Sequence, residues 1–243
     1  MIETRDLCKN FKDKKRGVVK AVDHVNFNCK AGEVYGLLGP NGAGKTTTLR
    51  IISTALKPTS GTALINGVDV SKEPQKVREQ IGFLSGNTGL YGRLTAREMV
   101  AYFGKLYGMD DSLVARRTQE LFTLLDMNKF ADSRNEKLST GMKQKVSIVR
   151  SVLHDPPVMV FDEPTSGLDV MSSRTIVDFI KKCRDDGKCV IFSTHIMSEA
   201  MRLCDRVAII HNGRIYKEGT VNRLLEETQT NNLEDAFIKI VGE

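Results

Sequence analysis

A glycine-rich turn that runs directly into lysine and threonine constrains this chain more than any other feature of its sequence. The turn lies between an apolar run at 34–38, which predicts a strand, and a segment at 45–57 that predicts a helix. The spacing GxxxxGK(S/T) at such a junction is typical of a loop whose glycines turn backbone N–H groups towards a phosphate, aided by the helix dipole. The motif consists of Gly39, Pro40, Asn41, Gly42, Ala43, Gly44, Lys45 and Thr46. The sequence therefore predicts a phosphate-binding loop.

Acidic residues further along the chain complete the chemistry that such a loop needs. The Lys45 ammonium would reach the β- and γ-phosphates, and the Thr46 hydroxyl would coordinate Mg²⁺. The apolar run at 158–161 predicts a neighbouring strand that ends in Asp162, with Glu163 directly after it. Adjacent side chains on a strand diverge, so one acid can serve the metal while the other faces the water that attacks the γ-phosphate.

The composition indicates a globular protein. Of the 243 residues, 40% are hydrophobic and 27% are charged, and 36 basic against 30 acidic residues give a net charge of +6. This excludes intrinsic disorder, collagen and coiled coil. No apolar stretch approaches the roughly 20 residues of a membrane-spanning helix, and the five cysteines form no CxxC pair. We therefore expect a chain of the reducing cytosol, without a disulfide framework or a zinc site.

A dense basic run spans 9–20, with Phe11 as its only aromatic residue. A net charge of +6 is too mild to indicate nucleic acid by itself, and charge runs are usually solvated. We therefore expect a solvated loop over 9–20 and no nucleic-acid partner.

The order of elements predicts an α/β fold. Strands are expected at 22–29, 81–84, 190–193 and 207–210, and a hairpin at 62–67, with helical patterns between the later strands. This alternation favours a mostly parallel sheet whose loops carry the chemistry at the carboxyl ends of the strands. Over 94–151 the pattern becomes helical. Thr95 and Glu98 form a capping box, Gly108 can end the first helix, and 112–125 continues with helical periodicity, so we expect a helical lobe inserted into the sheet.

Three further features follow in a fixed order, and together with the loop they identify a family. The segment 138–142, Leu-Ser-Thr-Gly-Met, resembles the LSGGQ signature of the ATP-binding-cassette (ABC) ATPases. The D-loop of that family is similar to Ser166, Gly167, Leu168 and Asp169, and its switch histidine is similar to His195. The resemblance covers essentially the whole chain.

The resemblance implies a P-loop NTPase fold with a mostly parallel core, an antiparallel β subdomain near the N-terminus and an inserted α-helical subdomain. One ABC ATPase domain would occupy 1–243. Its nucleotide-binding core would be 1–86 and 152–228, its helical signature subdomain 87–151, and its short tail 229–243.

Roles for individual residues follow from the resemblance. ATP would be the substrate and Mg²⁺ the metal, held by Thr46 and Asp162. Glu163, His195 and Lys45 would act in catalysis, with His195 sensing the γ-phosphate. A single histidine near a strand end is more often structural, so His195 by itself would indicate little.

Adenine and the second half of the site are also implied. Phe11 stands where the family places an aromatic ring against adenine, although alone it could be a core residue, and Thr47 continues the phosphate loop. In ABC proteins the signature of one subunit closes on the nucleotide of the other, which implies a head-to-tail homodimer. The residues so contributed are Ser139, Thr140, Gly141 and Met142. Taken alone, Ser139 would merely cap a surface helix.

The chain departs from the family pattern at two positions. Most ABC ATPases carry a glutamine after the 81–84 strand that contacts Mg²⁺ and the transmembrane partner, but here Gly86 occupies that position. The carbonyl of Asn87 could serve instead, although its side chain is shorter and displaced by one residue. Met142 replaces the last glutamine of the signature, which removes a polar contact to the opposing nucleotide.

We expect an ATP-binding subunit of a bacterial exporter, peripheral on the cytoplasmic face of the membrane, that docks on a separate permease through 86–102. The ending at 233–237 resembles ATPases of export permeases, and 89–95 resembles the sodium-extrusion branch, so sodium is the expected substrate. A drug exporter of the daunorubicin-resistance type is the alternative. A soluble ABC ATPase acting on DNA or ribosomes is an alternative of another class, but such relatives usually carry a coiled coil or two fused cassettes.

Overall fold

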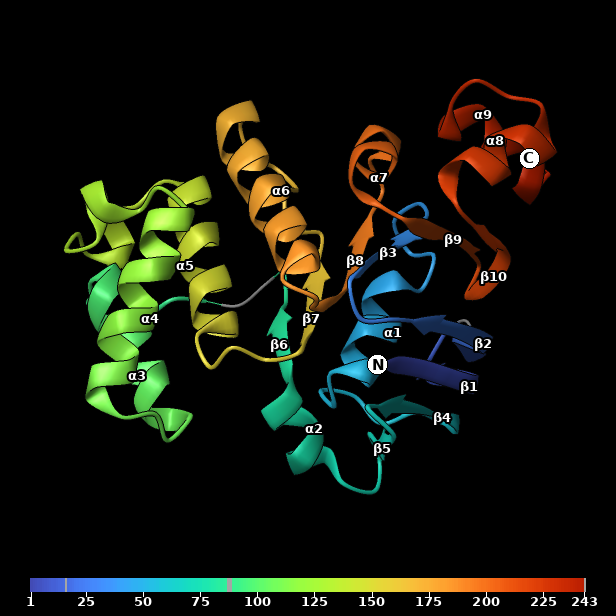
Figure 1. Cartoon of the computed structure of the whole chain (residues 1–243). Coiled ribbons are helices and arrows are strands. Elements are labelled where there is room, and N and C mark those ends of the chain that lie inside the picture. The colour runs from blue at the N-terminus through green and yellow to red at the C-terminus, as the bar shows by residue number, and fades with distance from the viewer. Residues whose placement is uncertain (16, 87–88, 243) are drawn as a thin grey trace.

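The structure is a computed structural model that describes residues 1–15, 17–86 and 89–242. Its centre is a sheet of order β10-β9-β3-β8-β7-β6, in which all pairs except β10 with β9 are parallel (Figure 1). The strands are β3 (Glu33–Leu38), β6 (Ile81–Leu84), β7 (Val158–Asp162), β8 (Cys189–Thr194), β9 (Arg206–His211) and β10 (Arg214–Gly219). The expected α/β fold with a mostly parallel sheet is confirmed.

The middle strands are buried at every position, as parallel strands covered on both faces must be. Their side chains alternate between two hydrophobic clusters: Val190 and Phe192 pack on the side of the helical lobe, and Ile191 packs on the other side. Each fully buried side chain of this size stabilises the fold by roughly 1.5–3 kcal/mol. The apolar runs seen in the sequence are therefore the interior of a three-layer arrangement.

An antiparallel sheet of order β2-β1-β4-β5 covers one face together with α1 (Lys45–Ile52). Its strands are β1 (Ile2–Asp13), β2 (Gly17–Cys29), β4 (Ser60–Ile65) and β5 (Val68–Asp69). The hairpin expected at 62–67 is confirmed: Asn66 and Gly67 join β4 to β5 with φ of 50° and 82°, the left-handed values that such a two-residue turn requires.

The loop expected over 9–20 is wrong, because β1 and β2 pair along most of it. Register shifts on both sides of Lys9 interrupt the alternation of side chains that would have indicated a strand. The described residues between positions 9 and 20 are largely exposed, so the basic side chains there are solvated as expected. Backbone pairing holds the hairpin together while its lysines stay in water.

The first helix also differs from its prediction, since α1 ends at Ile52 and not at residue 57. Ser53 caps it, and Thr54 adopts a left-handed backbone with φ of 62° that cannot continue a helix. The chain then turns towards β4.

Three helices, α3 (Ala96–Leu106), α4 (Asp111–Leu124) and α5 (Thr140–Val152), gather on the side of the molecule opposite to the antiparallel sheet (Figure 1). The capping box is confirmed: Glu98 N donates to Thr95 Oγ1 at 3.1 Å, and Thr95 N donates to Glu98 Oε2 at 2.8 Å. Gly108, with φ of 70°, follows the end of α3 as expected. These helices form the inserted lobe.

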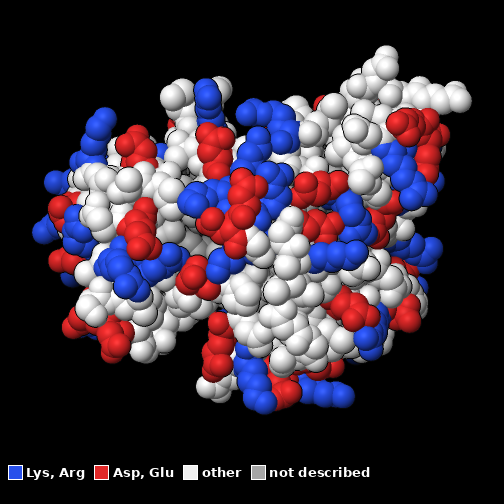
Figure 2. All heavy atoms as spheres, viewed as in Figure 1, with Lys and Arg blue, Asp and Glu red and all other residues white. Residues whose placement is uncertain are grey.

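The remaining helices complete the layers. Helix α6 (Val170–Asp185) joins the lobe in covering one face of the central sheet, and α2 (Pro74–Gln80) precedes β6. Helices α7 (Met197–Leu203), α8 (Val221–Thr228) and α9 (Leu233–Val241) pack around β9. Within the described ranges, no helix combines the length and the apolar character that crossing a bilayer demands. On the face shown in Figure 2, basic and acidic side chains are interspersed.

A half-buried histidine lies where the lobe meets the sheet. His154, just after α5, stacks on Tyr107 with ring centroids 4.0 Å apart, and its Nε2 donates to the carbonyl oxygen of Ile81 at 3.2 Å. Its Nδ1 is buried and has no hydrogen-bond partner in the described structure. Because burial disfavours the charged ring, the pKa of His154 falls to about 4.

The depressed pKa makes the stability of the fold depend on pH. As pH falls from about 6.5 towards about 4, His154 becomes protonated in the unfolded state but stays neutral in the folded state. The free energy of unfolding therefore decreases over this range. We expect this residue to account for about 2 kcal/mol of the loss between pH 7 and pH 5. Urea denaturation at the two pH values would measure it. His154→Gln should lack this part of the loss, and a variant that kept the full pH dependence would contradict the assignment.

Candidate active site

Parallel pairing brings four loops to one edge of the central sheet. The register places Leu38 beside Thr194, Asp162 beside Ser193, and Leu84 beside Phe161. The loops that leave β3, β8, β7 and β6 therefore start side by side, at the edge where open α/β sheets bind ligands. The predicted phosphate loop, His195, Glu163 and Gly86 all lie in these loops.

The phosphate loop closes tightly onto the helix that follows it. A Cβ on Gly39 would lie 2.1 Å from the carbonyl oxygen of Ile210, so only glycine fits there. Gly44, with φ of 107°, is the N-cap of α1, and a Cβ on it would lie 2.4 Å from the carbonyl oxygen of Ala21. No side chain caps α1, so its first N–H groups are available to an anion.

Lys45 is the buried cation of this loop, with 4% of its surface exposed. Its Nζ donates to the carbonyl oxygens of Gly39 at 2.7 Å and Pro40 at 3.0 Å, and it lies 3.3 Å from Glu163 Oε1. Three oxygens thus hold the ammonium between the phosphate loop and the loop after β7. A phosphate group arriving at the loop would meet this charge at close range.

Asp162 ends β7 with its carboxylate fixed by two hydroxyl groups. Thr46 Oγ1 donates to Asp162 Oδ1 at 3.0 Å, and Ser193 Oγ donates to the same oxygen at 2.7 Å. The Thr46 hydroxyl and the carboxylate are oxygen ligands of the kind that Mg²⁺ prefers. The predicted metal pair is therefore adjacent, and its donor set fits that ion.

Glu163 points to a different set of groups, as expected for its position next to Asp162. Its Oε2 lies 3.2 Å from His195 Nδ1, while Oε1 faces Lys45. Its backbone is left-handed, with φ of 48°, and is held by hydrogen bonds from Glu163 N to the hydroxyl and carbonyl oxygens of Ser193 at 3.0 and 3.2 Å. A non-glycine residue in this conformation is strained, and such strain concentrates at functional sites.

A cleft of about 400 Å³ adjoins these residues and separates the sheet edge from α5. It is polar and brings the phosphate loop, the loop after β6 and the segment after β7 together with the start of the signature helix. The lining residues are Asn41, Thr46, Arg50, Gly86, Thr140, Gln144, Asp162, Glu163, Ser166 and Leu168.

The signature begins α5 with an exposed hydroxyl. Ser139 is the N-cap, and its Oγ accepts from Met142 N at 3.3 Å. A Cβ on Gly141 would lie 2.5 Å from Ser172 Oγ, so this glycine permits α5 to approach the first turn of α6. Asp169 caps α6 by accepting from Ser172 N at 2.9 Å. The signature and the D-loop therefore lie against each other within one chain.

Two predicted positions lie apart from this cluster. Phe11 is on the β1–β2 hairpin with 42% of its surface exposed, and Lys9 Nζ lies 5.3 Å from the centroid of its ring. The ring is thus a surface platform and not part of the core. Asn87, the possible substitute for the missing glutamine, lies outside the described residues.

Sequence reasoning did not assign roles to several residues that the fold places in the site. The Ser193 hydroxyl contacts both acidic residues, because it donates to Asp162 Oδ1 and accepts from the backbone N–H of Glu163. Gln144 Nε2 donates to the carbonyl oxygen of Pro164 at 2.9 Å, and this bond connects the signature helix to the segment after Glu163. Glu199 accepts from two threonine hydroxyls in the same region. In the sequence, only Ser193 carried a signal for such a role, as a serine near the end of an apolar strand. The contacts of Gln144 and Glu199 join segments that are distant in the sequence, so no local pattern indicated them.

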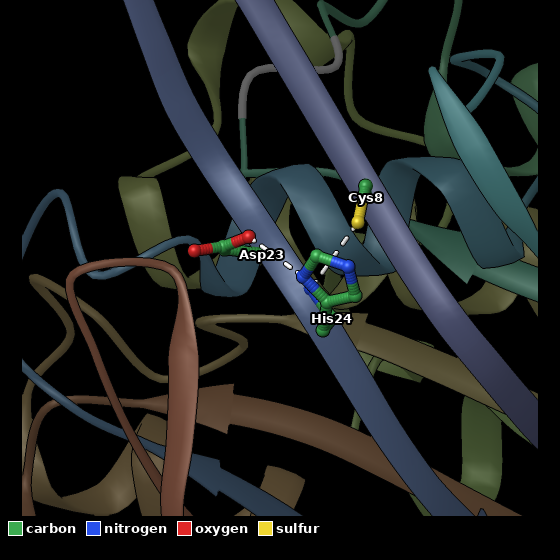
Figure 3. A group of neighbouring side chains, drawn as sticks. All are labelled: Cys8, Asp23 and His24. Atoms are coloured by element: carbon green, nitrogen blue, oxygen red, sulfur yellow. Dashed lines mark hydrogen bonds and ion pairs between the residues drawn. The ribbon is translucent and has the colours of Figure 1, made fainter.

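A second cluster contains residue types that can bind metals: Cys8, Asp23 and His24 (Figure 3). His24 N donates to Cys8 Sγ at 3.2 Å, and His24 Nδ1 lies 2.9 Å from Asp23 Oδ1. Arg214 Nε donates to Asp23 Oδ2 at 2.7 Å, and this bond, followed by that from His24, lowers the pKa of the Asp23 carboxyl. Each of the three groups thus has a partner within the protein.

The same cluster is connected to the phosphate loop through backbone hydrogen bonds. Asp23 N donates to the carbonyl oxygen of Gly213 at 2.8 Å, and Gly213 N donates to that of Ala43 at 2.9 Å. These bonds connect β2, the turn between β9 and β10, and the phosphate loop. We therefore assign a structural role to the cluster.

Comparisons with known proteins agree with this geometry. The family model described as ABC transporter matches residues 22–166. The chain is 42% identical to the ABC transporter ATP-binding protein NatA of Bacillus subtilis (strain 168), over 98% of this chain and 97% of that protein. It is 36% identical to the daunorubicin/doxorubicin resistance ATP-binding protein DrrA of Streptomyces peucetius, over 95% of this chain and 68% of that protein.

Among solved structures, the dimeric structure of MJ0796, a bacterial ABC transporter cassette, matches with a TM-score of 0.83 and 29% identity, over 91% of this chain and 99% of that chain. Fold, site and sequence point to the same conclusion. The chain belongs to the ABC transporter family, as an ATP-binding protein that hydrolyses ATP.

Proposed function

We propose that this chain is the ATPase subunit of a bacterial exporter, and that it closes as a head-to-tail homodimer on two ATP molecules to drive a separate membrane permease. The observation that carries the proposal is the convergence of Lys45, Asp162, Glu163 and His195 at one sheet edge. For ATP hydrolysis at this site to move a permease, a second subunit has to close on the site.

The roles of the residues within one subunit follow from their surroundings. The uncapped start of α1 and the Lys45 ammonium bind the β- and γ-phosphates, and Phe11 offers its exposed ring to adenine. Glu163, between Lys45 and His195, orients or deprotonates the attacking water. His195 contacts the γ-phosphate and senses its loss. Thr46 and Asp162 would hold Mg²⁺, which would supply positive charge to offset the negative charge of the phosphates.

Dimerisation is supported by the exposure of the signature. Ser139 and Thr140 are exposed at the start of a 13-residue helix, whose N–H groups and dipole favour a phosphate. The D-loop ends in exposed Asp169, directly beside the signature and followed by exposed Val170 at the start of α6, so both motifs can face an opposing subunit. The structural similarity to a dimeric ABC cassette is consistent with this arrangement.

The proposals for the permease contact and for the transported substrate rest on resemblance to known exporters. We propose docking through 86–102, where Tyr91 and Tyr102 are exposed and their rings meet edge to face at 5.9 Å. Greater identity to NatA than to DrrA favours the sodium-extrusion branch over the drug exporters, so sodium is the proposed substrate. In either case the chain would work on the cytoplasmic face of the membrane.

Replacing the proposed base should separate binding from hydrolysis. Glu163→Gln keeps the size of the side chain but removes its charge, so we expect hydrolysis to fall by about 10²-fold or more while ATP stays bound. Light scattering with ATP and Mg²⁺ should then show a stable dimer. Glu79→Gln, on the exposed face of α2, is the control and should hydrolyse ATP like the wild type. A Glu163→Gln protein that stayed monomeric with ATP would contradict the sandwich.

Removing the buried cation should instead weaken binding. Lys45→Ala deletes a charge-assisted contact to phosphate, and we expect the Kd for ATP to rise about tenfold to a hundredfold. Equilibrium binding with a fluorescent ATP analogue would measure it, and Lys72→Ala, an exposed lysine before α2, would be the control. Thermal melting without nucleotide would show that both variants fold. Unchanged affinity would remove Lys45 from the site.

The transport proposal needs its own experiment. The gene would be expressed with its chromosomal neighbours, and we expect the chain to co-purify from membranes with an integral membrane protein. Vesicles containing the pair and loaded with sodium should lose it when ATP is supplied, and loss of daunorubicin alone would favour the drug-exporter branch. A chain that stays partnerless would favour the soluble ABC class.

A further inference from the structure

We propose that Glu199 is a positioning residue for ATP hydrolysis. It fixes the segment after β7, which contains the D-loop, against the segment after β8, which contains His195. The inference rests on the proposed roles of Glu163 and His195. Glu199 lies in the first turn of α7, and its hydrogen bonds within the described part of the chain go to Thr165 and Thr194, so it acts through these neighbours.

One carboxylate oxygen of Glu199 serves both loops. Glu199 Oε2 accepts from Thr165 Oγ1 at 2.8 Å and from Thr194 Oγ1 at 3.2 Å. Both threonines are buried, with 5% and 3% of their surface exposed, so neither hydroxyl can exchange this partner freely for water. A hydrogen bond to a carboxylate is about twice as strong as one between neutral groups, so Glu199 links the two threonines firmly.

The Thr165 end of this link holds the segment after β7. Ser166 N donates to the carbonyl oxygen of Glu163 at 3.2 Å, and Leu168 N donates to that of Thr165 at 3.2 Å. Thr165 is thus the middle of a tight turn that starts at the proposed base and continues into the D-loop. A shift of Thr165 would move Glu163 as well.

The Thr194 end holds the segment after β8. Ile196 N donates to Thr194 Oγ1 at 3.0 Å, which folds the backbone around His195, and Gly39 N donates to the carbonyl oxygen of Thr194 at 3.3 Å. Thr194 therefore sets the position of His195 relative to the phosphate loop. With both threonines on one oxygen, Glu199 fixes the 3.2 Å approach of His195 Nδ1 to Glu163 Oε2.

This arrangement also links the two subunits of the proposed dimer. The D-loop is exposed and would be pressed by the opposing subunit on closure. Because Thr165 and Thr194 share a single oxygen, movement of the D-loop reaches His195 through Glu199. Glu199 would then make hydrolysis depend on closure.

The first test separates positioning from binding. In Glu199→Ala we expect kcat for phosphate release by the purified chain to fall about tenfold to a hundredfold, while the Kd for ATP changes by less than about twofold, because misplacing reacting groups slows chemistry more than binding. Glu199→Gln keeps an acceptor oxygen and should recover most of the rate. Ser198→Ala, an exposed neighbour on α7, should behave like the wild type. A wild-type kcat in Glu199→Ala would overturn the inference.

The second test asks whether Glu199 acts through Thr165. Thr165→Val should lower kcat, Thr165→Ser should retain it, and Thr165→Val combined with Glu199→Ala should lose far less than the product of the two single losses. Losses that simply multiply would overturn the link. If Glu199→Ala does not fold, the two Thr165 variants still test the link. An equal kcat in Thr165→Val and Thr165→Ser would then contradict it.

Glu163→Gln, measured in parallel, distinguishes this inference from the proposed site. If Glu163→Gln stops hydrolysis while Glu199→Ala does not change it, only the Glu199 inference fails. If Glu163→Gln hydrolyses ATP normally, the proposed base is wrong and the inference fails with it.

Discussion

The parallel pairing of β3, β8 and β7 is the constraint on which the rest of the structure depends. It sets Leu38 beside Thr194 and Asp162 beside Ser193, so the loops that follow the three strands begin within hydrogen-bonding distance of one another. The strands can pair in this way because both faces of the sheet are covered, by the helical lobe with α6 on one side and by α1 with the antiparallel sheet on the other.

Ser193 turns this alignment of strands into an arrangement of functional groups. Its hydroxyl donates to Asp162 and accepts from the backbone of Glu163, so a single side chain orients the proposed metal ligand and holds the next residue in a strained, left-handed conformation. That conformation sends Glu163 towards Lys45 and His195, away from Asp162. The strain is tolerated because the two hydrogen bonds from Glu163 N to Ser193, on the neighbouring buried strand, hold the backbone in place.

Local signals predicted the fold well wherever one short segment contained the whole physical cause. The capping box at Thr95 and Glu98, the Asn66-Gly67 turn and the buried strands were all correct, since each depends on neighbouring residues. The expected loop over 9–20 was wrong because bulges hid its alternation, and α1 was predicted too long because the left-handed Thr54 follows from the path towards β4. In both cases contacts between distant segments overrode local preference.

The sequence by itself determined the phosphate loop, the two acids where β7 ends, the signature and the family, because these motifs carry their chemistry in residue type and spacing. Only the tertiary structure decided how the groups meet: that Thr46 and Ser193 share one oxygen of Asp162, that Gln144 reaches Pro164, and that Glu199 connects the loops after β7 and β8. Such contacts join residues that lie up to 116 positions apart, and spacing along the chain gives no measure of distance across a sheet edge.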